Sequence, residues 1–173
     1  MIKILFVCHG NICRSPMAEF VMKKLVQDLP ATSARTAADF EIASAATSTE
    51  EIGNPVYPPA RRMLASHGID CSGKTARQMT VADYNHYDYI VLMDQNNLRN
   101  LRWILPRDIY EREIGAATDN SKPHKVSLLM DWAHKSRDVA DPWYTGDFET
   151  AYNDIDTACR AILQTLTTDN LAE

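Results

Sequence analysis

The chain has 173 residues, 45% of them hydrophobic, which is an ordinary content for one globular domain spanning residues 1–173. The 23 acidic residues outnumber the 18 basic ones, and a net charge of −5 without a basic run argues against a nucleic-acid or anionic-membrane surface. No apolar stretch is long enough to span a bilayer, and the four cysteines lack the spacing of a secreted disulfide scaffold, which favours a reducing cytoplasm.

The first predicted element is a buried strand over residues 4–7, followed by a loop over residues 8–14 and then a helix. Ser15 is expected as the helix N-cap and Pro16 as the first helical residue. The order strand, loop, helix is typical of an anion-binding site, because the N–H groups of the loop converge at the positive end of the helix dipole. Arg14 is suited to bind two phosphate oxygens, and Cys8 would point its sulfur at the phosphorus. Such a positive field favours the thiolate form of a cysteine.

The rest of the chain alternates between helical and strand patterns. Apolar spacing and cap residues predict helices over residues 16–29, 58–67, 80–84, 94–101 and 148–166. Apolar runs predict further strands over residues 40–46, 89–93 and 126–130. Residues 103–124 show no readable periodicity, because Pro106, Gly115 and Pro123 interrupt it. Residues 131–146 are expected to form a loop that carries Asp141.

Strands that alternate with helices predict an α/β fold, in which a parallel sheet has helices on both faces. Ligands bind such sheets beyond the carboxyl ends of the strands. Cys8, Ser44, Asp94 and the loop bearing Asp141 all follow predicted strands, so we expect them at one edge of the sheet. Asp141 should therefore lie near Cys8 in space.

The nine residues from Cys8 to Pro16, CHGNICRSP, resemble the phosphate-binding loop of the low-molecular-weight protein tyrosine phosphatases. The resemblance continues over nearly the whole chain, through residues 44–48, 53–55, 77–78, 88–90 and 141–144. It implies the family's fold, a single-domain, doubly wound, four-stranded parallel sheet. It also implies a phosphomonoesterase that hydrolyses phosphotyrosine in proteins, and small aryl phosphates, through a phosphocysteine intermediate. No cofactor is expected. No metal site is expected either, because the five histidines are not spaced with further histidines or cysteines as metal ligands are.

The resemblance assigns roles to individual residues. Cys8 becomes the nucleophile, Arg14 stabilises the transferring phosphoryl group, and Asp141 is the general acid and later the base. Without the resemblance, Asp141 is better explained as part of a turn than as a catalytic group, because Asp-Pro is a common loop dipeptide. The expected phosphate-binding residues are His9, Gly10, Asn11, Ile12, Cys13, Arg14 and Ser15. The expected support of this loop consists of Asn11, Ser15, Ser44 and His67.

Cys13 allows two interpretations. It is either a small, tightly packed residue or, as in the family, a redox partner that captures oxidised Cys8 in a reversible disulfide. Cys71 and Cys159 are expected to be structural.

The walls of the expected pocket depart from the family pattern. Trp143 and Tyr144 supply one aromatic wall, but Glu50 stands where the family usually has Trp or Tyr. Glu50 is a solvated loop charge, or it selects substrates with a cationic neighbour, or it weakens the binding of simple aryl phosphates. The expected partner is a phosphotyrosine-containing protein or peptide, inorganic phosphate is the product, and the chain is expected to act as a monomer or weak dimer.

Three other functions compete. A protein-arginine phosphatase would use Glu50 to bind a guanidinium, but such enzymes tend to have a small polar residue where Ile12 stands. A thioredoxin-coupled arsenate reductase needs a downstream cysteine pair, and none lies between Cys71 and Cys159. A non-catalytic phosphopeptide-binding module would be expected to lack Cys8 or Asp141.

Overall fold

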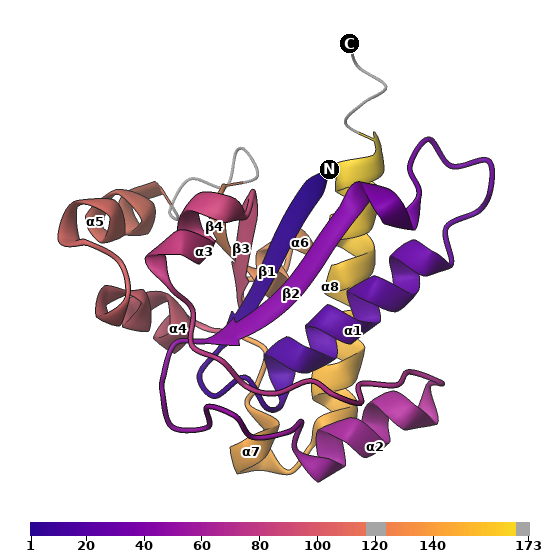
Figure 1. Ribbon diagram of the computed structural model, residues 1–173, viewed down its shortest axis with the longest axis horizontal. Helices are drawn as coiled ribbons and strands as arrows, with labels where there is room; N and C mark the ends of the chain where they lie inside the picture. Colours follow the sequence, from indigo (N-terminus) through magenta and orange to yellow (C-terminus); the bar gives the residue numbers. More distant parts are fainter. Residues whose placement is uncertain (117–123, 169–173) are drawn as a thin grey trace.

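The computed structural model describes residues 1–116 and 124–168, and at its centre lies a four-stranded parallel sheet (Figure 1). The strands, in the spatial order β2-β1-β3-β4, are β1 (Ile2–Cys8), β2 (Phe40–Ala46), β3 (Tyr89–Leu92) and β4 (Val126–Leu128). From β1 the chain first adds β2 on one side and then returns to add β3 and β4 on the other. The predicted doubly wound parallel sheet is therefore confirmed. Its strand order reverses next to β1, which is where such folds bind ligands.

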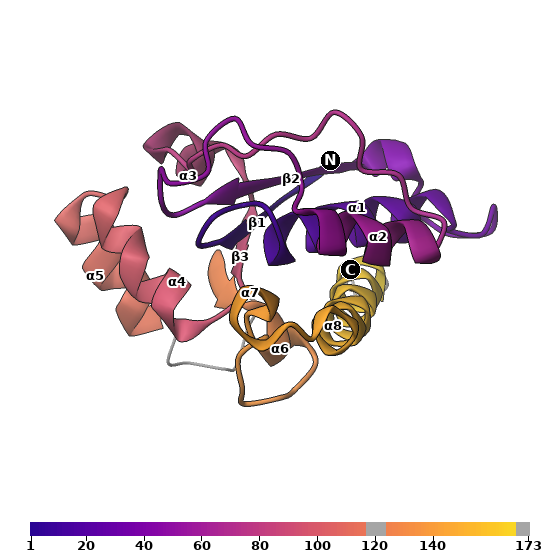
Figure 2. The same cartoon turned by 90° about the horizontal axis from the view of Figure 1, so that it is seen from below.

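Helices cover both faces of the sheet, with α1 and α8 on one side and α3, α4 and α5 on the other (Figures 1 and 2). The helices of the first side are α1 (Arg14–Gln27), α2 (Pro58–Ser66), α6 (Leu129–Trp132) and α8 (Phe148–Thr168). Those of the second side are α3 (Val81–His86), α4 (Gln95–Asn100) and α5 (Arg107–Ala116), with the 3-10 turn η2 (Leu101–Trp103). A further 3-10 turn, η1 (Ala37–Asp39), precedes β2, and α7 (Pro142–Thr145) lies at the edge of the sheet where the strands end.

The central strand β1 shows why both faces must be covered. Ile4 and Phe6 pack into the apolar cluster beneath α1 and α8, whereas Leu5 and Val7 pack into the cluster beneath α3 and α4. All four side chains are fully buried. An uninterrupted apolar run of this kind is typical of a strand covered on both sides.

Several predicted boundaries differ from the structure by one or two residues, and two of these differences have a clear local cause. α1 begins at Arg14 rather than Pro16, with Cys13 at the cap position, because the hydroxyl of Ser15 bonds inside the preceding loop instead of capping the helix. The fourth strand ends at Leu128 rather than Met130, since the chain turns directly into α6.

Three helices were not predicted from the sequence, and one of them, α6, begins inside the predicted strand 126–130. α5 lies within the unreadable segment 103–124, where Pro106 precedes the helix and Gly115 falls in its last turn, so neither residue interrupts its middle. Residues 117–123 of that segment lie outside the described residues. α7 lies within the expected loop 131–146, and Asp141 is its N-cap. In the part of the chain that is described, every helix is too short or too polar to cross a lipid bilayer.

One carboxylate is buried between α1 and β2. Only 5% of the Glu19 side chain is exposed, and its oxygens lie 2.6 Å from Lys23 Nζ and 3.1 Å from Lys74 Nζ. It also accepts a hydrogen bond from the hydroxyl of Ser44. Burial by itself raises the pKa of Glu19, but Lys74, Lys23 and Ser44 together outweigh burial and hold that pKa below its ordinary value.

The lowered pKa of Glu19 predicts a specific loss of stability in acid. A carboxyl group whose folded pKa lies below the unfolded value, about 4.3 for Glu, stabilises the fold above that pH and loses its contribution as the pH falls through the folded value. Glu19→Gln should flatten this acid dependence. At neutral pH it should lower the free energy of unfolding by about 3–5 kcal/mol, because Lys74 is left without its counter-ion.

Urea unfolding followed at pH 7 and across the acidic range measures both effects. Asp28→Asn is the matched control, because Asp28 forms an i,i+4 pair with Lys24 on the same helix but the pair is exposed. The control should change stability far less. Equal losses of unfolding free energy in Glu19→Gln and Asp28→Asn would show that the buried pair of Glu19 and Lys74 is no more stabilising than an exposed one.

Candidate active site

The loop between β1 and α1 surrounds the sulfur of Cys8. Cys8 is the last residue of β1, the backbone N–H of Asn11 donates to its Sγ at 3.3 Å, and Ser15 Oγ lies 3.0 Å from the same sulfur. Asn11 has a φ of 59°, in the left-handed region that asparagine tolerates better than most residues. The N–H of Asn11 and the hydroxyl of Ser15 thus both lie within hydrogen-bond distance of the sulfur. Hydrogen-bond donors arranged in this way stabilise a negatively charged thiolate.

A chain of buried hydrogen bonds supports the loop from below. Asn11 Nδ2 donates to Ser15 Oγ and to Ser44 Oγ, both at 2.9 Å, and Asn11 Oδ1 accepts from the backbone N–H of Arg77 at 3.1 Å. The hydroxyl of Ser44 donates in turn to Glu19. The loop that holds Cys8 is thus connected to the buried carboxylate between α1 and β2.

His67 does not belong to this support, which corrects one of our predictions. It is exposed at the C-terminus of α2, and its ring stacks on Tyr152 with centroids 4.0 Å apart. Within the described residues, no hydrogen bond joins it to the loop. Lys74 supports the loop instead, because it pairs with Glu19 and donates to the Ser44 carbonyl at 3.0 Å.

Neither Glu19 nor Lys74 was predicted from the sequence as part of the site. Glu19 carried a readable signal, since it lies four residues after Ser15 and four before Lys23 and so shares a helix face with both. Lys74 carried none, because it stands in an irregular segment.

Arg14, the first residue of α1, has an almost completely buried side chain, only 2% exposed. Its Nη1 donates to Asp94 Oδ2 at 2.7 Å and to the carbonyl of Val139 at 2.8 Å, and its Nη2 donates to Asp141 Oδ2 at 3.2 Å. Burial alone lowers the pKa of Arg14, but the negative groups of Cys8, Asp94 and Asp141 outweigh it and raise that pKa above its usual range. The site therefore keeps a permanent positive charge. Asp94 was predicted as a helix cap and placed at this edge of the sheet, but its bond to Arg14 was missed.

Asp141 reaches this site from the far end of the chain. It is the N-cap of α7, where its Oδ1 accepts from the backbone N–H of Trp143 at 3.1 Å while its Oδ2 faces Arg14. Its side chain is 25% exposed, so one part of the carboxyl group remains open to the pocket. The prediction that Asp141 and Cys8 meet at the carboxyl edge of the sheet is confirmed.

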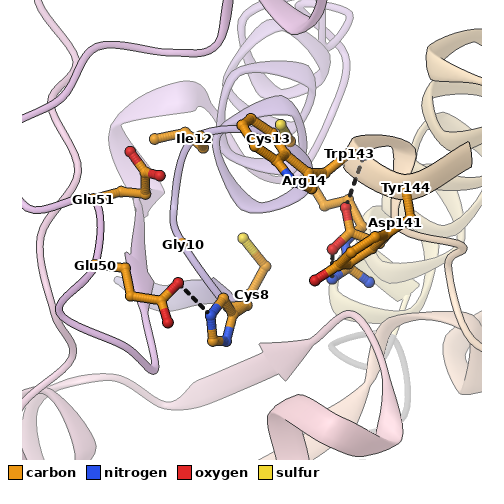
Figure 3. A pocket seen from close by; sticks show the side chains of 11 residues that line it. Cys8, Gly10, Ile12, Cys13, Arg14, Glu50, Glu51, Asp141, Trp143 and Tyr144 are labelled. Carbon is orange, nitrogen blue, oxygen red and sulfur yellow. Dashed lines mark hydrogen bonds and ion pairs between the residues drawn. The ribbon is translucent and has the colours of Figure 1, made fainter. Parts of the chain in front are cut away.

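These side chains line one pocket of about 410 Å³. Figure 3 shows the sulfur of Cys8 pointing into its open centre, with Glu50 and Glu51 on one side and Asp141, Trp143 and Tyr144 on the other. The complete lining consists of Cys8, His9, Gly10, Ile12, Cys13, Arg14, Glu50, Glu51, Asp141, Trp143 and Tyr144.

The two walls of the pocket differ in character. On the first wall Glu50 is not a free charge, because its carboxylate lies 2.9 Å from His9 Nε2, although 68% of its side chain is exposed. On the second wall Trp143 packs on Tyr57, with ring centroids 4.8 Å apart, and both Trp143 and Tyr144 remain exposed. A flat aromatic group can therefore stack on one side and meet a carboxylate on the other.

Cys13 also faces the pocket, but its surroundings differ from those of Cys8. Its side chain is buried, and burial together with the negative charges of Cys8 and Asp141 raises the pKa of the Cys13 thiol far above its ordinary value. A thiol with so high a pKa stays protonated near neutral pH and is a poor nucleophile.

The site as a whole combines a sulfur among hydrogen-bond donors, a buried guanidinium and a partly open carboxyl group. This set meets the needs of phosphoryl transfer, which are a nucleophile, a cationic group for the equatorial oxygens and a proton donor for the leaving group.

Comparison with known proteins gives the same assignment. The model of the family described as "Low molecular weight phosphotyrosine protein phosphatase" matches residues 3–172. The low molecular weight phosphotyrosine protein phosphatase of Gallus gallus is 39% identical over 164 residues, which cover 93% of each chain. Among solved structures, the low molecular weight protein tyrosine phosphatase SP-PTP of Streptococcus pyogenes is 34% identical, with a TM-score of 0.76 over 99% of this chain and 97% of that one.

A second solved structure, the drosophila arginine phosphatase DARP, is 28% identical, with a TM-score of 0.74 over 97% of this chain and 99% of that one. The family model and the relatives each span nearly the full length of the chain. The match extends well beyond the loop around Cys8 and includes the segment that carries Asp141. This chain therefore belongs to the low molecular weight phosphotyrosine protein phosphatase family.

Proposed function

We propose that this chain hydrolyses phosphotyrosine in proteins and peptides through a phosphocysteine intermediate. The Cys8 thiolate attacks phosphorus, so that a sulfur–phosphorus bond forms as the phosphorus–oxygen bond to the phenol breaks. Asp141 gives its proton to the departing phenolate oxygen. Asp141 then takes a proton from the water that attacks the thiophosphate, and inorganic phosphate and the thiolate are released. Ser15, 3.0 Å from the sulfur, stabilises the departing thiolate.

The observation that carries this proposal is that Arg14 bonds Asp141 in the same pocket into which Cys8 points. Arg14 and the N–H groups of the loop supply fixed donors for the three equatorial oxygens. Removing one such preorganised donor typically costs about 2.7–4 kcal/mol of barrier stabilisation. Because the donors are held by buried networks, little reorganisation is needed as charge develops.

The pocket walls favour an aryl phosphate. Trp143 offers a ring face, and Ile12 adds an apolar contact near the loop. Hydrolysis of phosphoarginine is the second candidate, because a solved relative is described as an arginine phosphatase and Glu50 is suited to bind a guanidinium.

Cys13 is proposed as the redox partner of Cys8. A disulfide between these two residues of one loop would protect Cys8 from irreversible oxidation and could be reversed by cellular thiols. Such protection suits a reducing compartment such as the cytoplasm, and we propose that the enzyme acts there as a monomer or weak dimer.

Substitution of the nucleophile separates catalysis from binding. Cys8→Ser should lower kcat by about 10⁴-fold or more, the scale on which enzymes lose rate without their nucleophile. Inorganic phosphate should still bind, because Arg14 and the loop remain. Steady-state kinetics and calorimetric titration with phosphate measure the two properties. Cys71→Ser, at another buried free thiol, is the control and should stay active. Appreciable turnover by Cys8→Ser would rule out the thiolate mechanism.

The proposed mechanism requires a thiolate nucleophile and a protonated acid together. It therefore predicts a bell-shaped dependence of the rate on pH, with an acidic optimum. Since both states are needed at the same time, the rate should fall on either side of the optimum. Asp141→Asn should remove the fall at high pH, and profiles of kcat/KM for both proteins test this. An optimum above neutrality would contradict the assignments.

A panel of matched peptides carrying phosphotyrosine, phosphoserine or phosphoarginine tests substrate choice. We expect phosphotyrosine to give the highest kcat/KM, because only its ring can stack on Trp143. Glu50→Tyr should raise kcat/KM for a simple aryl phosphate several-fold, as a second aromatic wall replaces a carboxylate, by roughly 0.5–1.5 kcal/mol for such a ring pair. A preference for phosphoarginine, lost in Glu50→Gln, would instead establish the second candidate.

A further inference from the structure

The segment that carries Asp141 has little regular structure of its own before α7. We call residues 137–146 the acid loop. Val139, which is fully buried, holds its middle, because its N–H donates to the Met93 carbonyl at 3.0 Å and its carbonyl accepts from Arg14. The neighbouring Asp138 accepts from the N–H of Gln95 at 3.1 Å. The loop is thus bonded to the carboxyl end of β3 and to the start of α4.

Arg137 begins the acid loop and connects it to α8. Its Nη1 and Nη2 donate to the two carboxylate oxygens of Asp154 at 2.6 and 2.7 Å, and Nη1 also lies 3.4 Å from the carbonyl of Asp138. The Asp154 side chain is only 10% exposed. A paired, two-point contact of this kind sets both the distance and the plane of the guanidinium.

The other end of the acid loop also meets α8. α7 ends at Gly146, which has a φ of 70°, and α8 begins two residues later at Phe148. Asp154 lies in the second turn of that helix. Asp141 is therefore carried on a loop whose two ends are both held at the start of α8, one by the chain itself and the other by Arg137.

We propose that Arg137 and Asp154 act as a positioning pair that sets the reach of Asp141 toward the leaving oxygen of the substrate. The proposal rests on the proposed function, in which Asp141 is the general acid. Proton transfer needs donor and acceptor within about 2.6–3.2 Å, and a misplacement of about 1 Å can cost on the order of 100-fold in rate. Arg137 does not line the pocket, and its hydrogen bonds go to Asp138 and Asp154.

The test compares two aryl phosphates that differ in their need for an acid. p-Nitrophenyl phosphate releases a stable phenolate and needs little protonation, whereas phenyl phosphate releases a much more basic one. Arg137→Ala should lower kcat/KM on the order of tenfold for phenyl phosphate, by analogy with the cost of a misplaced group, but less than about twofold for p-nitrophenyl phosphate. In an Asp141→Asn background, Arg137→Ala should cause no further selective loss, because there is no acid left to position.

Two further variants keep the test decisive. Asp154→Asn avoids leaving an unpaired charge in the interior and should show the same selective loss, even where Arg137→Ala folds poorly. Arg160→Ala is the matched control, since Arg160 pairs with Asp156 on α8 at 2.9 Å but, among the described residues, forms no hydrogen bond or ion pair with the acid loop. Thermal unfolding of each variant checks that it is folded.

Each outcome has a defined meaning. Equal losses on the two substrates, or a lower melting temperature with unchanged selectivity, would show that the pair is merely structural and would overturn the proposal. An additive loss in the Asp141→Asn background would overturn it as well. If Asp141→Asn lowered kcat/KM equally for the two substrates, Asp141 would not be the general acid. The positioning proposal would then be wrong as well.

Discussion

The structure depends on the burial of one cation. Arg14 stands at the start of α1 with its charge almost completely removed from solvent, and such a group is tolerated only where acceptors surround it. Its acceptors come from the cap of α4 at Asp94 and from the acid loop at Val139 and Asp141. These segments are distant in sequence, so the same bonds that satisfy the guanidinium also bring the proposed nucleophile, cation and acid together at one edge of the sheet.

A second buried network supports the same loop from the opposite side. It runs from the Lys74–Glu19 ion pair through Ser44 and Asn11 to Ser15 beside the sulfur of Cys8. Buried polar networks make the fold rigid when every member has its partner. The loop around Cys8 is therefore held by two buried charged groups. The Glu19 carboxylate, paired with lysines, lies below the loop, and the Arg14 guanidinium, paired with carboxylates, lies beside it. Preorganised donors of this kind are what a phosphoryl-transfer site requires.

The floor and the mouth of the pocket differ in how firmly their side chains are held. The floor is made of buried residues on β1 and α1, whereas the mouth is made of exposed side chains on loops, such as Glu50 and Tyr144. Related proteins described as tyrosine phosphatases and as an arginine phosphatase share this fold. A buried floor with an exposed mouth allows one chemistry to serve different substrates, because function resides in the site and not in the fold.

The sequence by itself determined the alternation of strands and helices, the loop from Cys8 to Arg14 and the edge at which Asp141 would lie, because these follow from local periodicity and from the rules of parallel sheets. It left undecided which side chains complete the buried networks. His67 and Lys74 are only seven residues apart, and left-handed turns at Gly68 and Gly73 reverse the chain between them, so Lys74 returns to the sheet while His67 stays on the surface. Asp94 and Arg137 likewise gained their partners only through packing. The tertiary structure decided these contacts, since a buried charge selects whichever partner the folded chain places beside it.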